Sequence, residues 1–251
     1  MRFDKRVALV TGGTSGIGEA TAVLFAEEGA QVAIVGRNEE RGNAVVQRIG
    51  RDAIFIPADV CSADDCRRSI ERTVDAFGRI DVLFNNAGVY FANDAVDCSE
   101  DEWDAQIDTS LKGAFLMSKF ALPHMIAQGS GSIVHCSSGW GVVGGAKAVA
   151  YCAAKGGMIL MTKAMAIDHG PQGIRVNAVC PGDTDTPMEH EDAENQGLSW
   201  DDFVHQAVAG RAIERMATPE EIARAVLFLA SDESAFTTGV ALPVDGGGVA
   251  D

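Results

Sequence analysis

The sequence predicts an α/β protein built on one doubly wound, seven-stranded parallel sheet with helices on both faces. Seven short apolar runs rich in β-branched residues predict the strands, at 6–10, 31–35, 53–58, 80–86, 131–137, 174–180 and 240–244. These runs show little polar alternation, as expected of strands buried on both faces. Helical patterns fill the intervals, at 17–28, 39–49, 63–77, 100–127, 149–169, 200–210 and 219–230. Strands that alternate with helices in this way favour a parallel sheet.

The length and the even patterning indicate a single domain over residues 1–251. A chain of 251 residues is long enough to bury one large core, and it contains no internal repeat or interdomain linker. The longest stretch without a periodic pattern is 182–199, which we expect to be irregular. Because loops of that length are commonly functional, we predict a substrate lid over about 183–210.

The composition excludes several classes of partner. The chain has 20 Lys and Arg against 36 Asp and Glu, a formal net charge of −16. Nucleic acid and anionic membrane surfaces attract basic proteins, so neither is an expected partner. No apolar run is long enough to span a membrane. The opening "MRFDKRVALVTGG" is interpreted as a first strand and not as a signal peptide, so we expect a cytoplasmic protein.

The cysteine and histidine patterns favour neither disulfides nor a metal site. None of the six cysteines has C-x-x-C spacing, and several lie in apolar runs, which suits reduced thiols. The histidines form no H-E-x-x-H motif. A metal at 189–191, "EHE", is the alternative to a solvated acidic loop, and we predict the loop.

A glycine-rich turn joins the first predicted strand to the first predicted helix. Gly12, Gly16 and Gly18 lie in "VTGGTSGIGEA". Such glycines let backbone amides approach a pyrophosphate, and the following helix presents its positive N-terminal end. Because a strand precedes the turn and a helix follows it, the pattern predicts dinucleotide binding and a Rossmann-type fold. The candidate binding residues are Gly12, Thr14, Ser15, Gly16, Ile17 and Gly18.

A tyrosine and a lysine share one face of a predicted helix in "AYCAAKGG". Tyr151 and Lys155 are four residues apart and therefore point the same way. A free phenol has a pKa near 10, and a nearby cation favours its ionised form. We expect Tyr151 to act as a general acid or base on an alcohol or carbonyl, with Lys155 lowering its pKa.

Five motifs together resemble the short-chain dehydrogenase/reductase family, in its branch of roughly 250-residue single-domain proteins. They are "TGGTSGIG" (11–18), "NNAG" (85–88), the Tyr151–Lys155 pair, "PGDTDTP" (181–187) and "VDGG" (244–247). The resemblance covers essentially the whole chain and has the motifs in the right order. It implies a nicotinamide-dependent oxidoreductase that acts on CH–OH groups.

The resemblance also assigns roles to individual residues. Ser138, which precedes Tyr151 by thirteen residues, matches the serine that bonds the substrate oxygen, and Ser137 is interpreted as structural. Lys155 would also hold the nicotinamide ribose. Asp59 and Val60 resemble the family's adenine-contacting pair, although Asp59 is also placed to cap the next helix. The remaining implied cofactor contacts are Asn86, Ala87, Gly88, Pro181, Gly182, Thr184 and Thr186.

One position departs from the family pattern. The family usually has an asparagine, in a pattern like N-x-x-G, that fixes a water beside the catalytic lysine. Here "QIDTSLKGAF" puts Ser110 in that place. Ser110 is therefore a weaker catalytic candidate, and its presence puts the proton relay in doubt more than the activity.

The end of the second predicted strand bears on which dinucleotide binds. An acidic residue there commonly bonds the ribose of NAD, but this chain reads Val35-Gly36-Arg37. Glycine leaves room for a 2′-phosphate, and an arginine can pair with it. The pattern favours NADP(H), while Glu39 and Glu40 keep NAD(H) open.

The predicted lid and its surroundings suggest a neutral alcohol/ketone pair, perhaps cyclic, aromatic or steroid-like. The substrate candidates are Ser138, Trp140, Tyr151 and Met188, with Tyr90, Val142 and Val143 as further lining candidates. The acidity of 183–202 disfavours a highly anionic substrate, and Ser132 stands where carrier-dependent reductases of this family often have arginine.

Two other functions stay open from the sequence. A 3-oxoacyl-carrier-protein reductase is the alternative enzyme. A non-catalytic dinucleotide-sensing regulator is the alternative from another class. The helix at 149–169 is apolar on nearly every side, which predicts a subunit contact, and the resemblance implies a homodimer or homotetramer.

Overall fold

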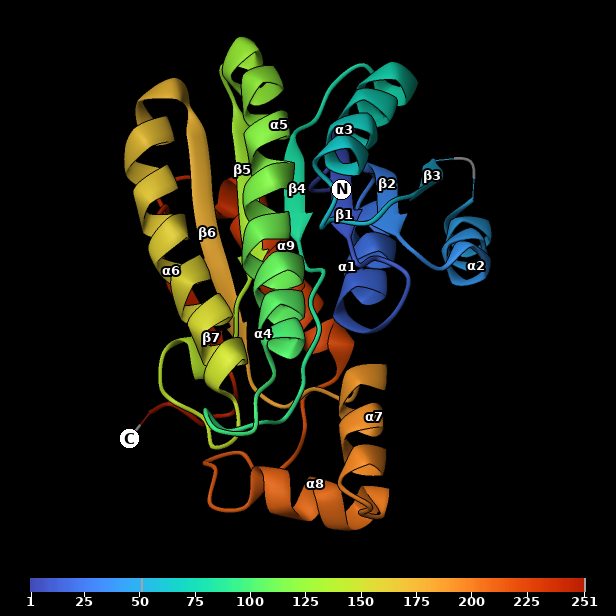
Figure 1. Ribbon diagram of the computed structural model, residues 1–251. Coiled ribbons are helices and arrows are strands. Elements are labelled where there is room, and N and C mark those ends of the chain that lie inside the picture. The colour runs from blue at the N-terminus through green and yellow to red at the C-terminus, as the bar shows by residue number, and fades with distance from the viewer. Residues whose placement is uncertain (51, 251) are drawn as a thin grey trace.

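The computed structural model describes residues 1–50 and 52–250 and confirms the predicted fold class. Figure 1 shows one twisted sheet, and all seven strands pair in parallel in the order β3-β2-β1-β4-β5-β6-β7. The strands are β1 (Val7–Thr11), β2 (Gln31–Gly36), β3 (Ala53–Pro57), β4 (Val82–Asn85), β5 (Gly131–Cys136), β6 (Ile174–Pro181) and β7 (Ala241–Val244).

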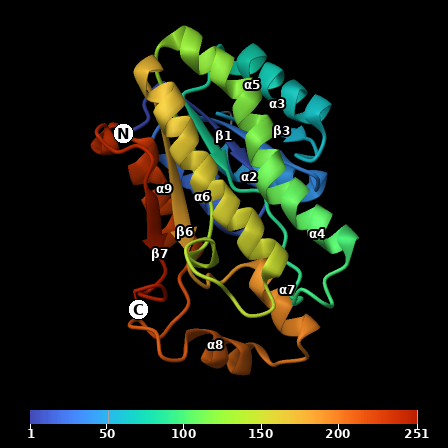
Figure 2. The ribbon, with the colours of Figure 1, turned by 60° about the vertical axis from the view of Figure 1, so that its left-hand side comes forward.

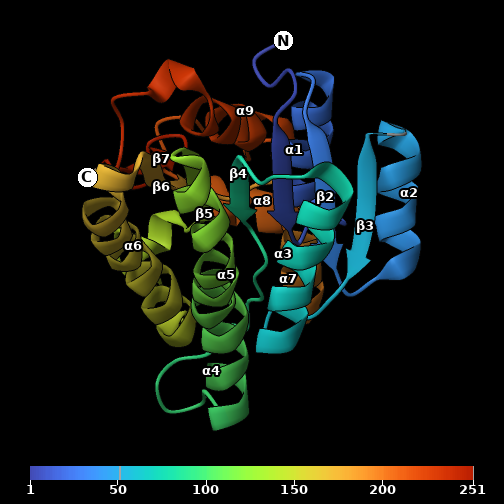
Figure 3. The same ribbon diagram turned by 90° about the horizontal axis from the view of Figure 1, so that it is seen from above.

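Helices cover both faces of the sheet, as Figure 3 shows from above. On one face lie α1 (Gly16–Glu27), α2 (Glu39–Ile49) and α9 (Pro219–Ala230). On the other lie α3 (Ala63–Phe77), α5 (Gly113–Gln128) and α6 (Val149–His169), with α4 (Glu100–Gln106) running into α5. Short 3₁₀ turns occupy η2 (Gly139–Gly141), η3 (Gly170–Gln172) and η4 (Asp232–Ser234). No helix in the described ranges is long and apolar enough to cross a membrane.

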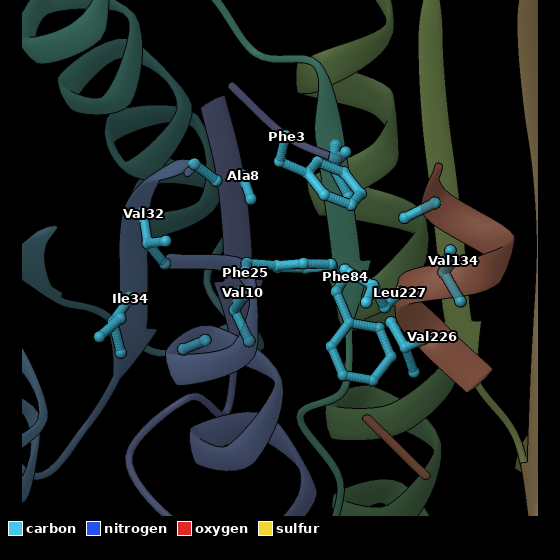
Figure 4. Packing of buried hydrophobic residues seen from close by; sticks show 14 of the residues in the cluster. Phe3, Ala8, Val10, Phe25, Val32, Ile34, Phe84, Val134, Val226 and Leu227 are labelled. Carbon is cyan, nitrogen blue, oxygen red and sulfur yellow. The ribbon is translucent and has the colours of Figure 1, made fainter. Parts of the chain in front are cut away.

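The continuous apolar character of the strands follows from burial on both faces. Figure 4 shows one of the two cores, where Phe25 of α1 and Val226 of α9 meet Phe84 of β4. The other core lies beneath α3, α5 and α6 and includes Leu83 of the same strand. Phe84 and Leu83 are adjacent residues of β4 and enter opposite cores, so both faces of this strand are buried.

The strand order reverses between β1 and β4. From β1 the chain builds outward to β2 and β3, then returns to place β4 on the other side of β1. At such a switch point the loops after the two strands diverge, and ligands bind at the carboxyl ends of the strands. The loops that follow Thr11 and Asn85 leave the sheet at this point.

Two segments differ from the sequence-based expectations. The stretch 182–199 is not irregular throughout, because α7 (Pro187–Asn195) begins at a proline whose fixed φ suits the first turn of a helix. The helix predicted over 100–127 contains the π-helical turn η1 (Ile107–Lys112) between α4 and α5. Hydrophobic periodicity does not distinguish a π turn from an α turn, so the sequence alone did not indicate it.

The lid forms a small layer of its own beyond the carboxyl edge of the sheet (Figures 1 and 2). Between α7 and α8 (Trp200–Val208) lies a separate apolar cluster around Phe203 and Ala193. The two stems of the lid pair with each other, because Ala217 N donates to Asp183 O at 2.9 Å and Asp185 N donates to Ala217 O at 3.0 Å. The chain therefore returns at Ala217, later than residue 210.

A buried polar network lies between β4, β5 and α5. The Asn85 amide Nδ2 lies 3.0 Å from Ser118 Oγ and 3.2 Å from His135 Nδ1. The second ring nitrogen of His135 has no hydrogen-bond partner within the described residues. Burial, aided by the Lys155 charge, lowers the pKa of His135 from 6.5 to about 3. Protonating this ring in the folded protein is therefore costly.

This network makes stability depend on pH. Between the lowered pKa of folded His135 and its ordinary value, the unfolded chain binds a proton that the native protein does not. Stability from this source is complete above about pH 6.5 and falls as the pH is lowered. From pH 7 to pH 5, urea unfolding should show the wild type losing about 2 kcal/mol more than His135→Asn. Parallel pH profiles of the two proteins would contradict this account.

Candidate active site

The glycine turn between β1 and α1 is shaped for close approach. Gly12 and Gly16 have φ values of +62° and +53°, a region that favours glycine. A Cβ at Gly18 would lie 2.2 Å from Gly12 O and 2.5 Å from Asn86 Nδ2. The helix N-terminus therefore sits directly against the turn, as the glycine spacing predicts. Such a turn, with free amides at the start of a twelve-residue helix, fits a pyrophosphate.

Side chains from both sides of the switch point hold this turn in place. Asn86 Nδ2 donates to Thr11 O and Gly12 O, both at 3.2 Å. Thr11 Oγ1 accepts hydrogen bonds from the backbone amides of Asn86 at 3.0 Å and Ala87 at 3.2 Å. The loop after β4 is thereby joined to the loop after β1. The Asn86 side chain therefore stabilises the glycine turn directly, and the sequence motif did not indicate this structural contact.

The end of β2 faces the same turn. A Cβ at Gly36 would lie 2.7 Å from Thr14 Cγ2, so a larger residue there requires the Thr14 side chain to move. Glycine fits against Thr14 without that shift. Arg37 follows and is exposed.

Asp59, after β3, bonds the amide of Cys61 and does not cap α3, because Ser62 is the N-cap residue. The capping interpretation of Asp59 is therefore wrong.

A cavity of about 420 Å³ opens beside Thr14 and Ser15, between α1 and α2. Arg41 and Arg48 of α2 both line it. Arg48 is paired with Glu19 at 3.0 Å, whereas Arg41 has no ion pair in the part of the chain that the structure describes. The sequence motifs did not indicate Arg41. Its position, four residues after Arg37, was the available signal.

Tyr151 and Lys155 lie on one face of α6, as their spacing predicts. Lys155 Nζ is 5.4 Å from the centre of the Tyr151 ring and donates to Cys136 O at 2.7 Å. Lys155 is only 3% exposed, and no carboxylate pairs with it among the described residues. Burial of this charge lowers its pKa. The end of β5 therefore fixes the ammonium beneath the phenol.

The pKa of Tyr151 differs from the sequence-based expectation. Burial raises it above its ordinary value of 10, and Cys136 and Glu189, when ionised, act in the same direction. The Lys155 ammonium does not reverse this rise. The Ser138 hydroxyl opposes it by hydrogen bonding. Tyr151 is therefore a protonated phenol in the structure as it stands, ready to donate.

The two serines after β5 have different surroundings. Ser137 is buried, and its hydroxyl donates to Lys155 O at 2.9 Å, which supports its structural interpretation. Ser138 Oγ accepts a hydrogen bond from Trp140 N at 3.1 Å, and its own proton remains free to donate. Ser138 is partly exposed beside Tyr151.

Ser110 lies in the π turn η1, 1% exposed, and its hydroxyl has no hydrogen-bond partner within the described ranges. A Cβ at Gly88 would lie 3.3 Å from Ser110 Oγ and 3.5 Å from Lys155 Nζ. Gly88 thus leaves a space between the hydroxyl and the ammonium. A π turn frequently marks a functional site, and here it turns this hydroxyl inward.

The segment after β6 covers the glycine turn. A Cβ at Gly16 would lie 3.1 Å from Thr186 Cγ2, so these two candidate residues are neighbours. Thr184 is buried and bonds Gly182 O at 2.9 Å. Pro181 ends β6, and Met188 is partly exposed in the first turn of α7.

Three aromatic rings meet around the tyrosine. The Tyr90 and Tyr151 ring centres are 5.2 Å apart with planes at 75°, and Trp140 lies 6.3 Å from Tyr151 at 87°. Tyr90 and Trp140 are themselves 6.0 Å apart. Edge-to-face contacts of this kind favour a fixed arrangement. Val142 and Val143, by contrast, are 47% and 45% exposed.

Comparison with known proteins places the chain in a family. A family model described as enoyl-(acyl carrier protein) reductase matches residues 12–248. A cis-4-hydroxycyclohexanecarboxylate dehydrogenase of Sinomonas cyclohexanicum is 42% identical over 98% of this chain and 97% of its own. A 3-oxoacyl-[acyl-carrier-protein] reductase of Thermotoga maritima is 39% identical over 98% and 99%. The crystal structure of levodione reductase superposes with a TM-score of 0.94, at 34% identity over 99% of both chains.

The chain belongs to the short-chain dehydrogenase/reductase family. It is an oxidoreductase of CH–OH groups that uses a nicotinamide dinucleotide. The residues present fit that cofactor. Gly12, Gly16 and Gly18 form a cradle that side chains would fill, and the carboxyl edge of the sheet leads from this cradle to Tyr151.

Asn86→Ala tests the junction between the two loops. The variant removes two partly buried hydrogen bonds to carbonyl oxygens, each worth about 0.5–1.5 kcal/mol. We expect urea unfolding to show a loss of about 1–3 kcal/mol and fluorescence titration to show weaker dinucleotide binding. Asn195→Ala, at an exposed position of α7, is the matched control. Parent-like stability and binding in Asn86→Ala would contradict the role given to this amide.

Proposed function

We propose that the protein transfers a hydride between NADP(H) and a neutral alcohol/ketone, with Tyr151 as general acid or base. The observation that supports this most strongly is the grouping of Ser138, Tyr151 and Lys155 at the carboxyl edge of the sheet, beside the glycine turn. A cyclic substrate is favoured because a related protein acts on a hydroxycyclohexanecarboxylate and aromatic rings surround Tyr151.

Each of the three residues has a distinct task in this proposal. In reduction, the Tyr151 hydroxyl gives its proton to the carbonyl oxygen while the carbonyl carbon receives the hydride; oxidation reverses both transfers. Ser138 donates a hydrogen bond to the same oxygen and stabilises its developing charge. Lys155, held by Cys136 O, supplies a fixed positive charge beneath the phenol. The nicotinamide, when bound, supplies or accepts the hydride.

The cofactor would lie along the carboxyl edge, from α2 to α6. The glycine turn would hold the pyrophosphate, and Asp59 with Val60 the adenine. The nicotinamide end would meet the segment after β6. Further contacts in this proposal are Thr14, Ser15, Ile17, Asn86, Ala87, Gly88, Tyr151, Lys155, Pro181, Gly182, Thr184 and Thr186.

NADP(H) is the favoured dinucleotide because Gly36 supplies no carboxylate at the end of β2. The Thr14 side chain lies against Gly36, and Arg37 and Arg41 supply positive charge beside it. Guanidinium groups bind phosphate in a planar, two-pronged manner. NAD(H) is the alternative.

Ser110 is proposed to take part in proton transfer between Lys155 and solvent. A water between its unpartnered hydroxyl and Lys155 Nζ would satisfy both groups and begin a proton path to solvent. This assignment gives the serine the task that the family's asparagine performs, with a shorter side chain.

A 3-oxoacyl-carrier-protein reductase is the second candidate, since a relative carries that name. The acidic residues of the lid near Tyr90, among them Glu189 and Asp192, weigh against a phosphorylated carrier.

The helix α6 leaves two large apolar side chains exposed, Leu160 at 67% and Ile167 at 76%. We propose that a second subunit covers them in a dimer or tetramer.

Tyr151→Phe removes only the hydroxyl that carries the proton. We expect kcat to fall by about 100- to 10,000-fold in a steady-state assay on cyclic ketones. Dinucleotide affinity should stay within about twofold of the parent value, because the ring packing is kept. Turnover at the parent rate would refute the mechanism, because a group other than Tyr151 would then transfer the proton. Dinucleotide binding without turnover in the wild type would instead favour the dinucleotide-sensing role.

Arg37→Ala tests the preference for the 2′-phosphate. Calorimetric titration with adenosine 2′,5′-bisphosphate and with 5′-AMP separates the phosphate from the rest of the nucleotide. We expect the bisphosphate to bind about tenfold more weakly to the variant, with 5′-AMP unchanged. Arg48→Ala, whose arginine already pairs with Glu19, is the charge-matched control. Equal binding of both nucleotides by the wild type would refute the NADP(H) assignment.

A further inference from the structure

Tyr90 belongs to the group of three aromatic rings at the candidate active site. The position of its ring suggests that it contacts the substrate in addition to packing against its neighbours. Its ring stands edge-on to Tyr151 at 5.2 Å and lies 6.0 Å from Trp140. All three rings remain partly exposed. They come from three separate elements: the loop after β4, the turn η2 and the helix α6. Together they form a corner of ring faces beside the hydroxyl of Tyr151, and the carbon skeleton of a ring-shaped substrate fits such a surface.

Two polar groups beside this corner have no partner in the protein. Neither the Tyr90 hydroxyl nor the Glu189 carboxyl makes a side-chain hydrogen bond to another residue of the described chain. Glu189 is in the first turn of α7 and is close enough to the phenols of Tyr90 and Tyr151 to raise the pKa of both when it is ionised. The neighbouring Asp183 is different, since it is paired with Arg211.

The protonation states of Tyr90 and Glu189 determine which hydrogen bonds the two groups can form. Burial, together with Asp183 and Asp192, raises the pKa of Glu189 to about 8. Burial and the same carboxylates raise the pKa of Tyr90. At neutral pH each group therefore carries a proton that it can donate, and each can also accept a hydrogen bond. Such a pair can bind a hydroxyl or a carbonyl equally well.

We propose that Tyr90 and Glu189 are specificity-determining residues that bind a second oxygen of the substrate. The substrate class is then a ring that carries two oxygen functions, as a diol, hydroxyketone or dione. This inference rests on the proposed function: Tyr151 and Ser138 hold the reacting oxygen, and the aromatic corner holds the carbon ring. A substrate without the second oxygen would cover these polar groups and leave them unpaired, which such sites penalise strongly.

The test compares ring alcohols that differ in one oxygen. kcat/KM is measured for cyclohexanol, trans-cyclohexane-1,2-diol and trans-cyclohexane-1,4-diol with the preferred dinucleotide. The wild type should favour at least one of the diols by about tenfold or more. Tyr90→Phe and Glu189→Ala should each lower kcat/KM for that diol about tenfold more than they lower kcat/KM for cyclohexanol. Glu191→Ala, at an exposed position of α7, should change neither.

The outcomes separate the inference from the function on which it rests. If the wild type oxidises cyclohexanol as well as the diols, or if Tyr90→Phe lowers all three alike, the second-oxygen site is refuted and the oxidoreductase function stands. If no ring alcohol is oxidised and no ring ketone reduced, while the dinucleotide still binds, the proposed cyclic substrate fails as well. Dinucleotide titration of each variant shows that the cofactor site is intact.

Discussion

The hydrogen bonds among Thr11, Gly12 and Asn86 hold the rest of the active-site region in place. They join the loop after β1 to the loop after β4, where the strand order reverses and no strand pairing continues. Through Asn86 the glycine turn is set relative to Gly88, and Gly88 faces the Lys155 ammonium and the Ser110 hydroxyl. The glycine turn and the groups around Lys155 are therefore connected through one set of hydrogen bonds and close contacts.

A second constraint is the burial of charge next to that junction. Lys155 is held by one carbonyl oxygen, and its field reaches His135 and Cys136 in β5. Removing water strengthens each electrostatic interaction in the site, but it also keeps Tyr151 protonated until another positive group arrives. An oxidised nicotinamide carries such a charge. The same burial thus suits Tyr151 to donate a proton in the reduction of a carbonyl. In the oxidation of an alcohol, the acceptance of a proton by Tyr151 depends on the charge of the oxidised cofactor.

The sequence predicted those features of the fold and the candidate site that depend on residues close together in the chain. The strand count follows from seven continuous apolar runs, and the glycine turn follows from Gly12, Gly16 and Gly18 between a strand and a helix. The shared face of Tyr151 and Lys155 follows from their four-residue spacing. The sequence did not indicate α7 or the π turn at Ser110, and Asp59 is not the predicted cap. The raised pKa of Tyr151 and the cavity beside Arg41 arise from residues distant in the chain, so no local pattern encodes them.

The most direct test of this account is a fluorescence titration of the wild-type protein with NADPH and, separately, with NADH. It needs no choice of substrate. The account predicts saturable binding at one site, with NADPH the tighter ligand, because Gly36 supplies no carboxylate for the ribose of NAD(H) and Arg37 and Arg41 can pair with a 2′-phosphate. Absence of binding by either dinucleotide, in a sample shown to be folded, would contradict the central claim that the glycine turn and Asn86 form a dinucleotide site.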